Sequence, residues 1–293
     1  MSRGALSLLA PPFTLRLRHL PAEGRATGAC LLTHAMMANG GYLLRSLAPA
    51  CAARGLEVFV LDFRGHGGSG PRASRDVSWS FDDLLQEDVP LAARAIREAL
   101  PGLPLVYAGH SLGGLVGLAF QATAPAPERF ARLAPICSSI WDLSRRRPRR
   151  RRLWRTLELL ALEGLSRPLG RTAIVRASRF GTDEESLPYL RQLGSWHRSG
   201  TFRSLDRSCD YAAALAAIDV PVRLTFAEGD RWVAPEDRAR LAGWLPACTQ
   251  EVIEGRSSGL ALAPDHFALF TDCRAKPALE RLAAWLAVAR TTG

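Results

Sequence analysis

The 293-residue sequence predicts an α/β protein with a doubly wound, mostly parallel sheet and a mostly helical insertion. Three observations lead to this fold class. Short apolar runs alternate with stretches of helical spacing over the first half of the chain, the alternation stops near residue 141, and it resumes after residue 205. Hydrophobic residues at 47% and charged residues at 23% are typical of a globular protein with a sizeable core.

The predicted strands of the first half are of two kinds. Phe13–His19 alternates apolar and polar residues, so we expect a half-buried strand of an edge hairpin that turns at residues 21–28. The other strands are continuous apolar runs, which are typical of interior strands covered on both faces. These runs span residues 29–33, 56–62, 103–108 and 133–138.

Stretches of helical spacing separate these strands, at residues 42–54, 85–100 and 112–122. Strands and helices that alternate through right-handed crossovers give a parallel sheet. Residues 141–205 break the pattern and are interpreted as a cap over the sheet. We therefore expect a core of residues 1–140 and 206–293 that carries a cap of residues 141–205.

The alternation returns after the cap. A strand is predicted at residues 220–226, and a last short strand begins at Val252. The final helix has its apolar face at Leu279, Leu282, Ala283 and Leu286.

Charge and cysteine content narrow the class of protein. The net charge is +10, but Lys276 is the only lysine, so 38 − 1 = 37 of the basic residues are arginines spread along the chain. Such a uniform bias indicates codon usage rather than a nucleic-acid partner. The six cysteines form no CxxC pair or metal-binding pattern, which predicts reduced thiols, a cytoplasmic location and no metal. The N-terminal apolar stretch is too short for a secretory signal.

One true charge cluster stands out, the arginine-rich run Arg145–Arg155. The simpler interpretation is a solvated loop and first helical turn. The alternative is weak peripheral contact with an anionic membrane, since each basic residue near such a surface contributes about 1 kcal/mol.

The sequence Gly109-His110-Ser111-Leu112-Gly113 fits G-x-S-x-G between a predicted strand and a predicted helix. This context is that of a nucleophile elbow, in which the serine occupies a sharp, strained turn. The glycines remove side chains that would collide there. Ser111 is therefore the candidate nucleophile, and the Leu112 amide at the helix N-terminus would form half of an oxyanion hole.

A nucleophilic serine needs a base and an orienting acid, expected later in the chain and in loops after strands. His266 follows the last predicted strand and is the candidate base, because the other late histidine, His197, lies inside the predicted cap. Asp230 follows the strand at 220–226 and is the candidate acid. Asp142, after the strand at 133–138, is the rival acid.

The second oxyanion donor is expected in the loop that follows the strand at 29–33. Its position makes the Met36 amide the candidate, with His34 either orienting the loop or serving as a structural turn residue. Gly40 and Gly41 keep this loop small.

Together these segments resemble the α/β-hydrolase superfamily, in particular its lysophospholipase-like and serine-aminopeptidase-like branch with a helical cap. The resemblance covers most of the chain outside the cap. Besides the GHSLGG segment, residues 62–69 (DFRGHGGS) look like the D-x-R-G-x-G-x-S turn of that branch, to which we assign a structural role.

Two residues depart from the pattern of the branch. Ala35 stands where a glycine usually follows the histidine of the oxyanion loop. Asp265 stands where a glycine usually precedes the base, and its carboxylate is expected near the imidazole, where it would raise the pKa of His266.

The resulting hypothesis is a serine hydrolase that cleaves a carboxylic ester with a hydrophobic part, through an acyl-enzyme and without a cofactor. Acyl transfer, cleavage of an amide or carbon–carbon bond, and a catalytically silent ligand-binding protein remain alternatives. The apolar residues of the cap are expected to form its core or to line an acyl pocket: Trp141, Trp154, Leu157, Leu160, Phe180, Tyr189, Trp196 and Phe202.

Overall fold

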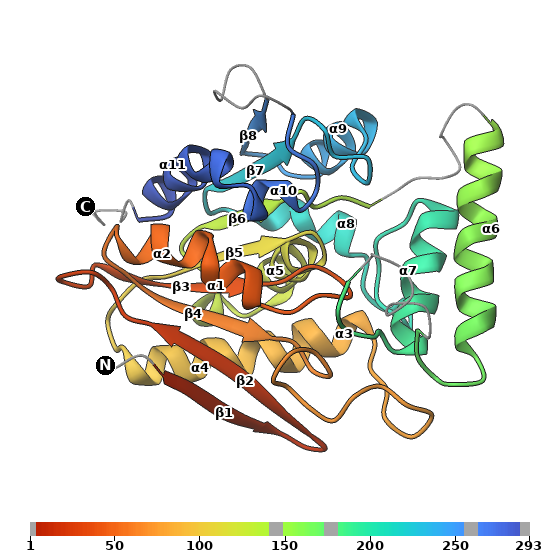
Figure 1. The fold of residues 1–293 in the computed structure, drawn as a ribbon, viewed down its shortest axis with the longest axis horizontal. Coiled ribbons are helices and arrows are strands. Elements are labelled where there is room, and N and C mark those ends of the chain that lie inside the picture. The colour runs from red at the N-terminus through yellow and green to blue at the C-terminus, as the bar shows by residue number, and fades with distance from the viewer. Residues whose placement is uncertain (1–3, 141–148, 173–180, 255–262, 288–293) are drawn as a thin grey trace.

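The computed structural model describes residues 4–140, 149–172, 181–254 and 263–287, and its centre is one eight-stranded sheet (Figure 1). The strand order is β1-β2-β4-β3-β5-β6-β7-β8; β1, β2 and β4 pair antiparallel and all later neighbours pair parallel. The strands are β1 Gly4–Ala10, β2 Phe13–Leu20, β3 Gly28–Thr33, β4 Leu56–Asp62, β5 Leu105–His110, β6 Leu133–Ile136, β7 Val222–Ala227 and β8 Cys248–Ile253. This mostly parallel sheet confirms the predicted fold class.

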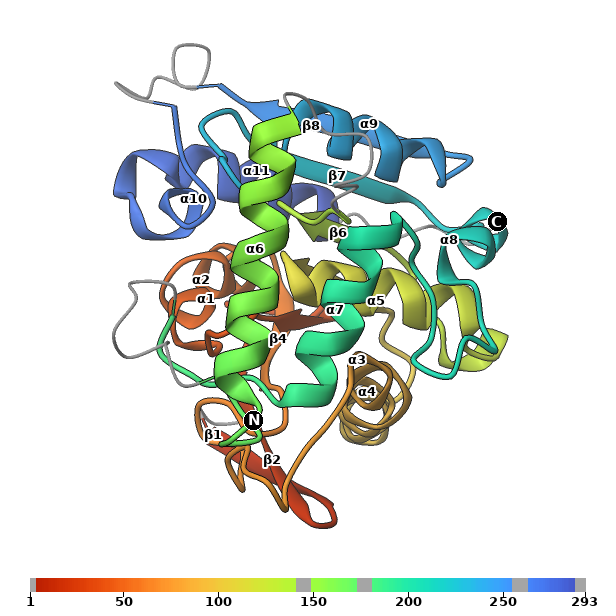
Figure 2. The ribbon, with the colours of Figure 1, turned by 90° about the vertical axis from the view of Figure 1, so that its right-hand side faces the viewer.

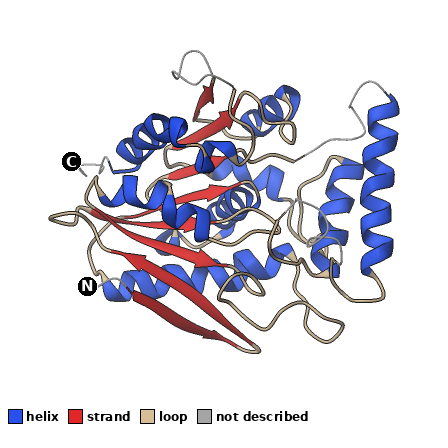
Figure 3. Cartoon of the chain, in the orientation of Figure 1, coloured by secondary structure: helices blue, strands red, loops and turns tan. Residues whose placement is uncertain are grey.

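Helices connect the strands and cover both faces of the sheet (Figure 3). The α-helices are α1 Gly41–Arg45, α2 Leu47–Ala52, α3 Phe81–Asp83, α4 Val89–Ala99, α5 Leu112–Thr123, α6 Arg149–Ser166, α7 Leu187–Ser199, α8 Tyr211–Ala214, α9 Pro235–Gly243, α10 Ala268–Thr271 and α11 Lys276–Ala287. Shorter helical turns are η1 Leu84–Asp88, η2 Ala126–Glu128, η3 Leu215–Ala217 and η4 Cys273–Ala275. None of the helices in the described part of the chain is long and apolar enough to cross a bilayer.

The interior strands bury side chains on both faces, which explains their continuous apolar sequences. Along β3, Leu31 packs into the core that includes α4 and α5, whereas Cys30 and Leu32 pack into the core under α2 and α11. Because successive residues of a strand point to opposite faces, each face needs an apolar residue at every second position. Both cores thus help to fix β3 and β5, the strands that carry the site.

The predicted hairpin, in which β2 would turn at residues 21–28 and pair with the next strand, β3, is wrong. β2 pairs with β1, through a turn at residues 10–13, and β4 lies between β2 and β3. β1 is an edge strand whose residues are mostly exposed although most of them are alanine or leucine, so its apolar sequence does not reflect burial in the sheet.

The predicted helix over residues 42–54 is broken into α1 and α2 at Ser46. In a continuous helix the ring of Pro49 would collide with the carbonyl group of Arg45. Ser46 leaves helical geometry, with φ of −122° and ψ of −82°, and its hydroxyl donates to the Tyr42 carbonyl oxygen over 2.7 Å. The break therefore has a local cause in the sequence.

Helices α6 and α7 stand together to one side of the sheet, with α6 outermost (Figures 1 and 2). Tyr189, Trp196 and Phe202 are buried, and Trp196 and Phe202 pack edge-on against Phe81 of α3. Trp154, Leu157 and Leu160 on α6 are exposed by 67%, 47% and 47%, so the expectation that they belong to the cap core or a pocket is wrong. Trp141 and Phe180 lie outside the described residues.

Candidate active site

Ser111 occupies a strained turn at the carboxyl end of β5. Its φ of 52° and ψ of −112° are unusual for a residue with a side chain. The two glycines of the motif are needed for close packing: a Cβ at Gly109 would lie 2.3 Å from the Gly113 carbonyl carbon, and one at Gly113 would lie 2.8 Å from the Thr33 carbonyl oxygen. The turn thus has the geometry of a nucleophile elbow, with β3 packed directly against it.

Two backbone hydrogen-bonding groups of Ser111 are fixed from β6 and the loop after it. The Ser111 N–H donates to the Ile136 carbonyl oxygen over 2.7 Å, and the Ser138 hydroxyl donates to the Ser111 carbonyl oxygen over 2.8 Å. The N–H of Leu112, the first residue of α5, has no acceptor within its helix, as at any helix start. That N–H is therefore available to an oxyanion.

His266 and Asp230 meet beside the elbow. Nδ1 of His266 lies 2.7 Å from Oδ2 of Asp230, and the His266 ring lies 4.6 Å from the ring of His110, the residue before Ser111. Both side chains come from loops, after β7 for Asp230 and before α10 for His266. The structure thus brings the predicted base and acid together, whereas the rival Asp142 lies outside the described residues.

The Asp230 carboxylate is held on its other side as well. Its Oδ1 accepts the N–H groups of Trp232 and Val233 over 2.8 and 3.2 Å. The side chain of Asp230 is fully buried and that of His266 is 10% exposed. A buried carboxylate fixed in this way orients the imidazole so that Nδ1 carries the proton and Nε2 keeps its lone pair.

His34 orients the loop that follows β3. Nε2 of His34 accepts the Phe63 N–H over 3.0 Å, so Nδ1 must carry the proton that is donated to the Ala35 carbonyl oxygen over 2.8 Å. Burial and the nearby positive charge of His66 lower the pKa of His34 to about 4, which keeps it neutral. Because a peptide group is planar, fixing the Ala35 carbonyl also fixes the direction of the Met36 N–H.

Ala35 is accommodated without loss of these contacts. It is buried, and its N–H donates over 3.0 Å to the hydroxyl of Tyr42, which lies 2.7 Å from Nδ1 of His110. Tyr42 therefore links the loop that carries Met36 to the residue before Ser111.

Asp265 has a different role from the one predicted. Its Oδ1 accepts the N–H groups of Phe267 and Ala268 over 3.0 and 2.7 Å, at the start of α10. The carboxylate is exposed and acts as a cap for a helix N-terminus.

The D-x-R-G-x-G-x-S turn has the structural role assigned to it. Asp62 accepts the N–H groups of Gly40 and Gly68 over 2.8 and 2.9 Å and pairs with Arg18. Arg64 donates to the buried carboxylate of Asp88. The turn thereby supports the loop that carries Met36 and Gly40.

Three possible metal ligands, one of them His266, also lie close together. Ligand atoms of His110, Cys137 and His266 lie within 4.8 Å of one another. Burial, and then the Asp230 carboxylate, raise the pKa of the Cys137 thiol well above its ordinary value, so the thiol is protonated in this environment. Nδ1 of His266 already faces Asp230. We therefore interpret this cluster as the buried surroundings of the His266 ring.

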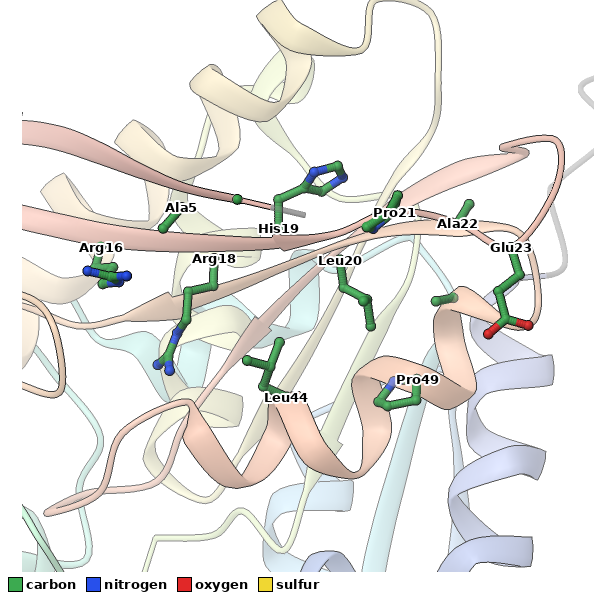
Figure 4. Close-up of a pocket in the computed structure, with 12 residues that line it drawn as sticks. Ala5, Arg16, Arg18, His19, Leu20, Pro21, Ala22, Glu23, Leu44 and Pro49 are labelled. Atoms are coloured by element: carbon green, nitrogen blue, oxygen red, sulfur yellow. The ribbon is translucent and has the colours of Figure 1, made fainter. Parts of the chain in front are cut away.

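A separate cavity of about 740 Å³ lies between β2 and the first helices (Figure 4). Its lining includes Arg16, Arg18, Leu44 and Pro49. None of its lining residues belongs to the elbow, to the His266–Asp230 pair or to the loop at Met36.

Fold and site together define an α/β-hydrolase, and comparison with known proteins gives its family. A family model described as serine aminopeptidase, S33, matches residues 24–256, so the chain belongs to this hydrolase family. The match confirms the resemblance to the serine-aminopeptidase-like and lysophospholipase-like branch and the prediction of a hydrolase.

One curated relative is a monoacylglycerol lipase from Mycolicibacterium smegmatis, 35% identical over 100 residues. The alignment covers 33% of this chain and 34% of that protein, about a third of the relative's length.

Solved structures share the fold over nearly the whole chain. An alpha/beta hydrolase, GrgF, from Penicillium sp. sh18 is 17% identical, with a TM-score of 0.64 and 98% of each chain covered. An esterase domain from a Rhodothermus marinus protein is also 17% identical, with a TM-score of 0.60 and 98% of each chain covered. A thioesterase domain from the curacin biosynthetic pathway has a TM-score of 0.62 at 16% identity, covering 97% of this chain and 99% of that chain.

Proposed function

We propose that this hydrolase cleaves carboxylic esters with a hydrophobic acyl or alkyl part, using Ser111 as nucleophile, His266 as base and Asp230 as orienting acid. The observation that carries the proposal is the 2.7 Å contact between His266 and the buried Asp230 beside the strained turn of Ser111. A base held in one tautomer next to a serine at the carboxyl end of a strand is the arrangement that acyl transfer requires.

The steps follow from this geometry. Nε2 of His266 takes the proton of the Ser111 hydroxyl as its oxygen attacks the ester carbonyl carbon. The amides of Leu112 and Met36 bind the oxyanion, and the protonated His266 then gives its proton to the leaving alcohol. Water activated by the same His266 releases the acid from the acyl-enzyme. Asp230 stabilises the His266 cation throughout.

The preference for a lipophilic ester has two supports. The aligned relative from Mycolicibacterium smegmatis is named a monoacylglycerol lipase, and one structural neighbour is an esterase domain. In addition, the cap helix α6 presents an apolar surface, on which a lipid-like substrate would first bind.

The test is hydrolysis of p-nitrophenyl esters from acetate to palmitate by wild-type and Ser111→Ala protein. We expect Ser111-dependent turnover with an optimum at medium or long acyl chains. A folded wild-type protein without activity at any length would contradict the ester proposal and favour an amide, a carbon–carbon bond or a silent binder. Adding alcohol acceptors separates hydrolysis from transfer, because transfer gives a new ester as product.

We also propose weak peripheral contact of the protein with anionic membranes through the region Arg145–Arg155 and the rest of α6. Residues 145–148 lie outside the described part, but α6 begins with four arginines, at positions 149–152. Its exposed apolar residues are Leu153, Trp154, Leu157, Leu160 and Leu165. A helix with an apolar outer face next to basic residues suits a membrane interface whose lipids are negatively charged.

Co-sedimentation with vesicles tests this contact. We expect the wild-type protein to bind vesicles that contain phosphatidylglycerol, to bind pure phosphatidylcholine less, and to be released by salt. Trp154→Glu and Leu157→Glu should each weaken binding, whereas Leu205→Glu, at another exposed leucine, should not. Equal binding by all variants would contradict the proposal. The cytoplasmic location stays a prediction.

A further inference from the structure

The cap segment 181–185 binds the loop that carries the proposed oxyanion donor. Both backbone polar groups of Met37, the residue after Met36, are bound from this segment. Its N–H donates to Oε1 of Glu185 over 2.8 Å, and its carbonyl oxygen accepts the N–H groups of Thr182 and Asp183 over 2.8 and 3.1 Å. The conformation at Met37 is therefore set by the cap.

Met37 needs this support because its backbone is strained. Its φ is 57°, in the left-handed region that residues with a side chain rarely adopt. Such a conformation persists only where surrounding contacts hold it. The approach of the cap is close, since a Cβ at Gly181 would lie 1.9 Å from the Met37 carbonyl oxygen.

Glu185 is itself held by a buried cation. Nε2 of His66 lies 3.1 Å from Oε1 of Glu185, and Nδ1 of His66 lies 2.8 Å from the Arg64 carbonyl oxygen. Both partners can only accept, so both ring nitrogens carry protons and His66 is an imidazolium. Burial lowers the pKa of His66, but the Glu185 carboxylate outweighs this effect and the net shift is upward.

The backbone of Glu185 is fixed within the cap. Its N–H donates to the Thr172 hydroxyl over 2.9 Å, and its carbonyl oxygen accepts the Thr172 N–H over 2.9 Å. The Glu185 and His66 side chains are both fully buried. The carboxylate therefore has little freedom to leave Met37.

These contacts bear directly on the Met36 amide. His34 fixes the peptide group before Met36, and Glu185 fixes the peptide group after it. We propose that Glu185 is a positioning residue for the oxyanion hole, which it supports from the cap by holding the Met36–Met37 peptide. This inference rests on the proposed ester hydrolysis. It makes correct docking of the cap a condition for full catalytic activity.

The test compares Glu185→Ala, Glu185→Asp and Glu185→Gln with a matched control, Glu184→Ala. Glu184 is the neighbouring residue and pairs with Arg171 inside the cap. We measure kcat and KM on the best p-nitrophenyl ester, and Ki for a trifluoromethyl ketone of the same acyl length. The ketone forms a hemiketal with the serine, so its Ki reports on the oxyanion hole.

We expect Glu185→Ala to lower kcat about 30-fold, with KM changed less than about threefold and Ki raised by the same factor as kcat falls. Glu185→Asp keeps the charge but withdraws the carboxylate, so kcat should fall about tenfold. Glu185→Gln keeps an acceptor for the Met37 N–H and should stay within about fivefold of wild type. Glu184→Ala should match wild type.

Wild-type kcat and Ki in folded Glu185→Ala, or a loss confined to KM, would overturn the proposal while the esterase function stands. If Glu185→Ala does not fold, Glu185→Asp decides in the same way. A wild-type protein without Ser111-dependent hydrolysis would overturn the proposed function and this inference together.

Discussion

Nδ1 of His266 lies 2.7 Å from Oδ2 of Asp230, although the two residues are 36 positions apart in the chain. The contact joins the loop after β7 to the loop before α10 at the same edge of the sheet as the turn of Ser111. Because both Oδ1 and Oδ2 of Asp230 are engaged, the carboxylate has one orientation and so does the imidazole.

Asp230→Asn should reduce kcat by about 10³- to 10⁴-fold with little change in KM. The asparagine side-chain oxygen would still accept hydrogen bonds from the N–H groups of Trp232 and Val233. The asparagine NH2 group would then face Nδ1 of His266. Nδ1 would then accept, and the proton would move to Nε2, where the base is needed. Steady-state kinetics on a p-nitrophenyl ester measures this loss.

Asp265→Asn is the control for that experiment. Asp265 precedes His266, but its carboxylate accepts backbone amides at the start of α10. The activity of Asp265→Asn should remain within about threefold of wild type, because the loss of an exposed helix cap lowers the stability by only about 1 kcal/mol. A small effect of Asp230→Asn, or an equal effect of both changes, would assign the acid elsewhere.

Gly113→Ala should destabilise the protein by about 2 kcal/mol. The new methyl group would lie 2.8 and 2.9 Å from the carbonyl oxygens of Thr33 and His34, and backbone atoms cannot move aside cheaply. Gly164→Ala is the matched change in α6, where no atom lies within 4 Å of the new Cβ. For Gly164→Ala we expect the free energy of unfolding to rise by about 0.5–1 kcal/mol, because alanine has a higher helix propensity than glycine. Urea unfolding distinguishes the two, and equal effects would contradict the close packing of the elbow on β3.

The buried histidines predict a loss of stability in acid. The pKa of His34 is lowered to about 4, from 6.5 in the unfolded chain, by burial and by His66. Between these pH values the unfolded state holds more protons, so lowering the pH favours unfolding, by on the order of 3 kcal/mol for His34 once the pH is below 4. The lowered pKa of His110 acts in the same direction. His66 acts oppositely, because its raised pKa stabilises the fold at low pH and this contribution is lost as pH rises through it.

His34→Gln isolates this contribution. A glutamine side chain can still accept from Phe63 and donate to Ala35, but it does not titrate. The free energy of unfolding, measured in urea from pH 7.5 to 4.5, should therefore fall less steeply in His34→Gln than in wild type. Parallel curves for the two proteins would show that His34 is not held neutral.

Asp62→Asn should destabilise the protein by about 3 kcal/mol, because it leaves the Arg18 guanidinium without its buried partner. The folded protein should lose much less in kcat per labelled serine than Glu185→Ala, because Asp62 holds the loop at Gly40, whereas Glu185 holds Met37, the residue next to the proposed Met36 donor. A thermal melt together with active-site titration tests both parts. An unchanged melting temperature would contradict the structural role of the turn.

Much of the core could be predicted from the sequence because its signals are local. The elbow combines a strained serine, glycines that allow close backbone approach, and flanking elements with clear periodicity. Position in chain order then singled out His266 and Asp230, which the structure brings together. The break at Ser46 also had a local signal, Pro49, that the apolar periodicity concealed.

Other parts could not be predicted, because they depend on contacts distant in sequence. Strand β1 is exposed at the sheet edge, and its alanines and leucines carry no signal for its pairing with β2. The exposure of Trp154 and Leu157 depends on α6 standing outermost, whereas apolar side chains alone predict burial. Glu185 carries no motif, and its contact with Met37 spans 148 residues.

The most direct test of the central claim is to locate the residue that forms the covalent enzyme intermediate. Wild-type, Ser111→Ala and Glu184→Ala proteins are treated with a fluorophosphonate, and the labelled peptide is identified by mass spectrometry. We predict one adduct, on Ser111, in wild type and Glu184→Ala, formed in step with the loss of ester hydrolysis, and none in Ser111→Ala. An adduct on another residue, or ester hydrolysis that survives Ser111→Ala, would contradict the account.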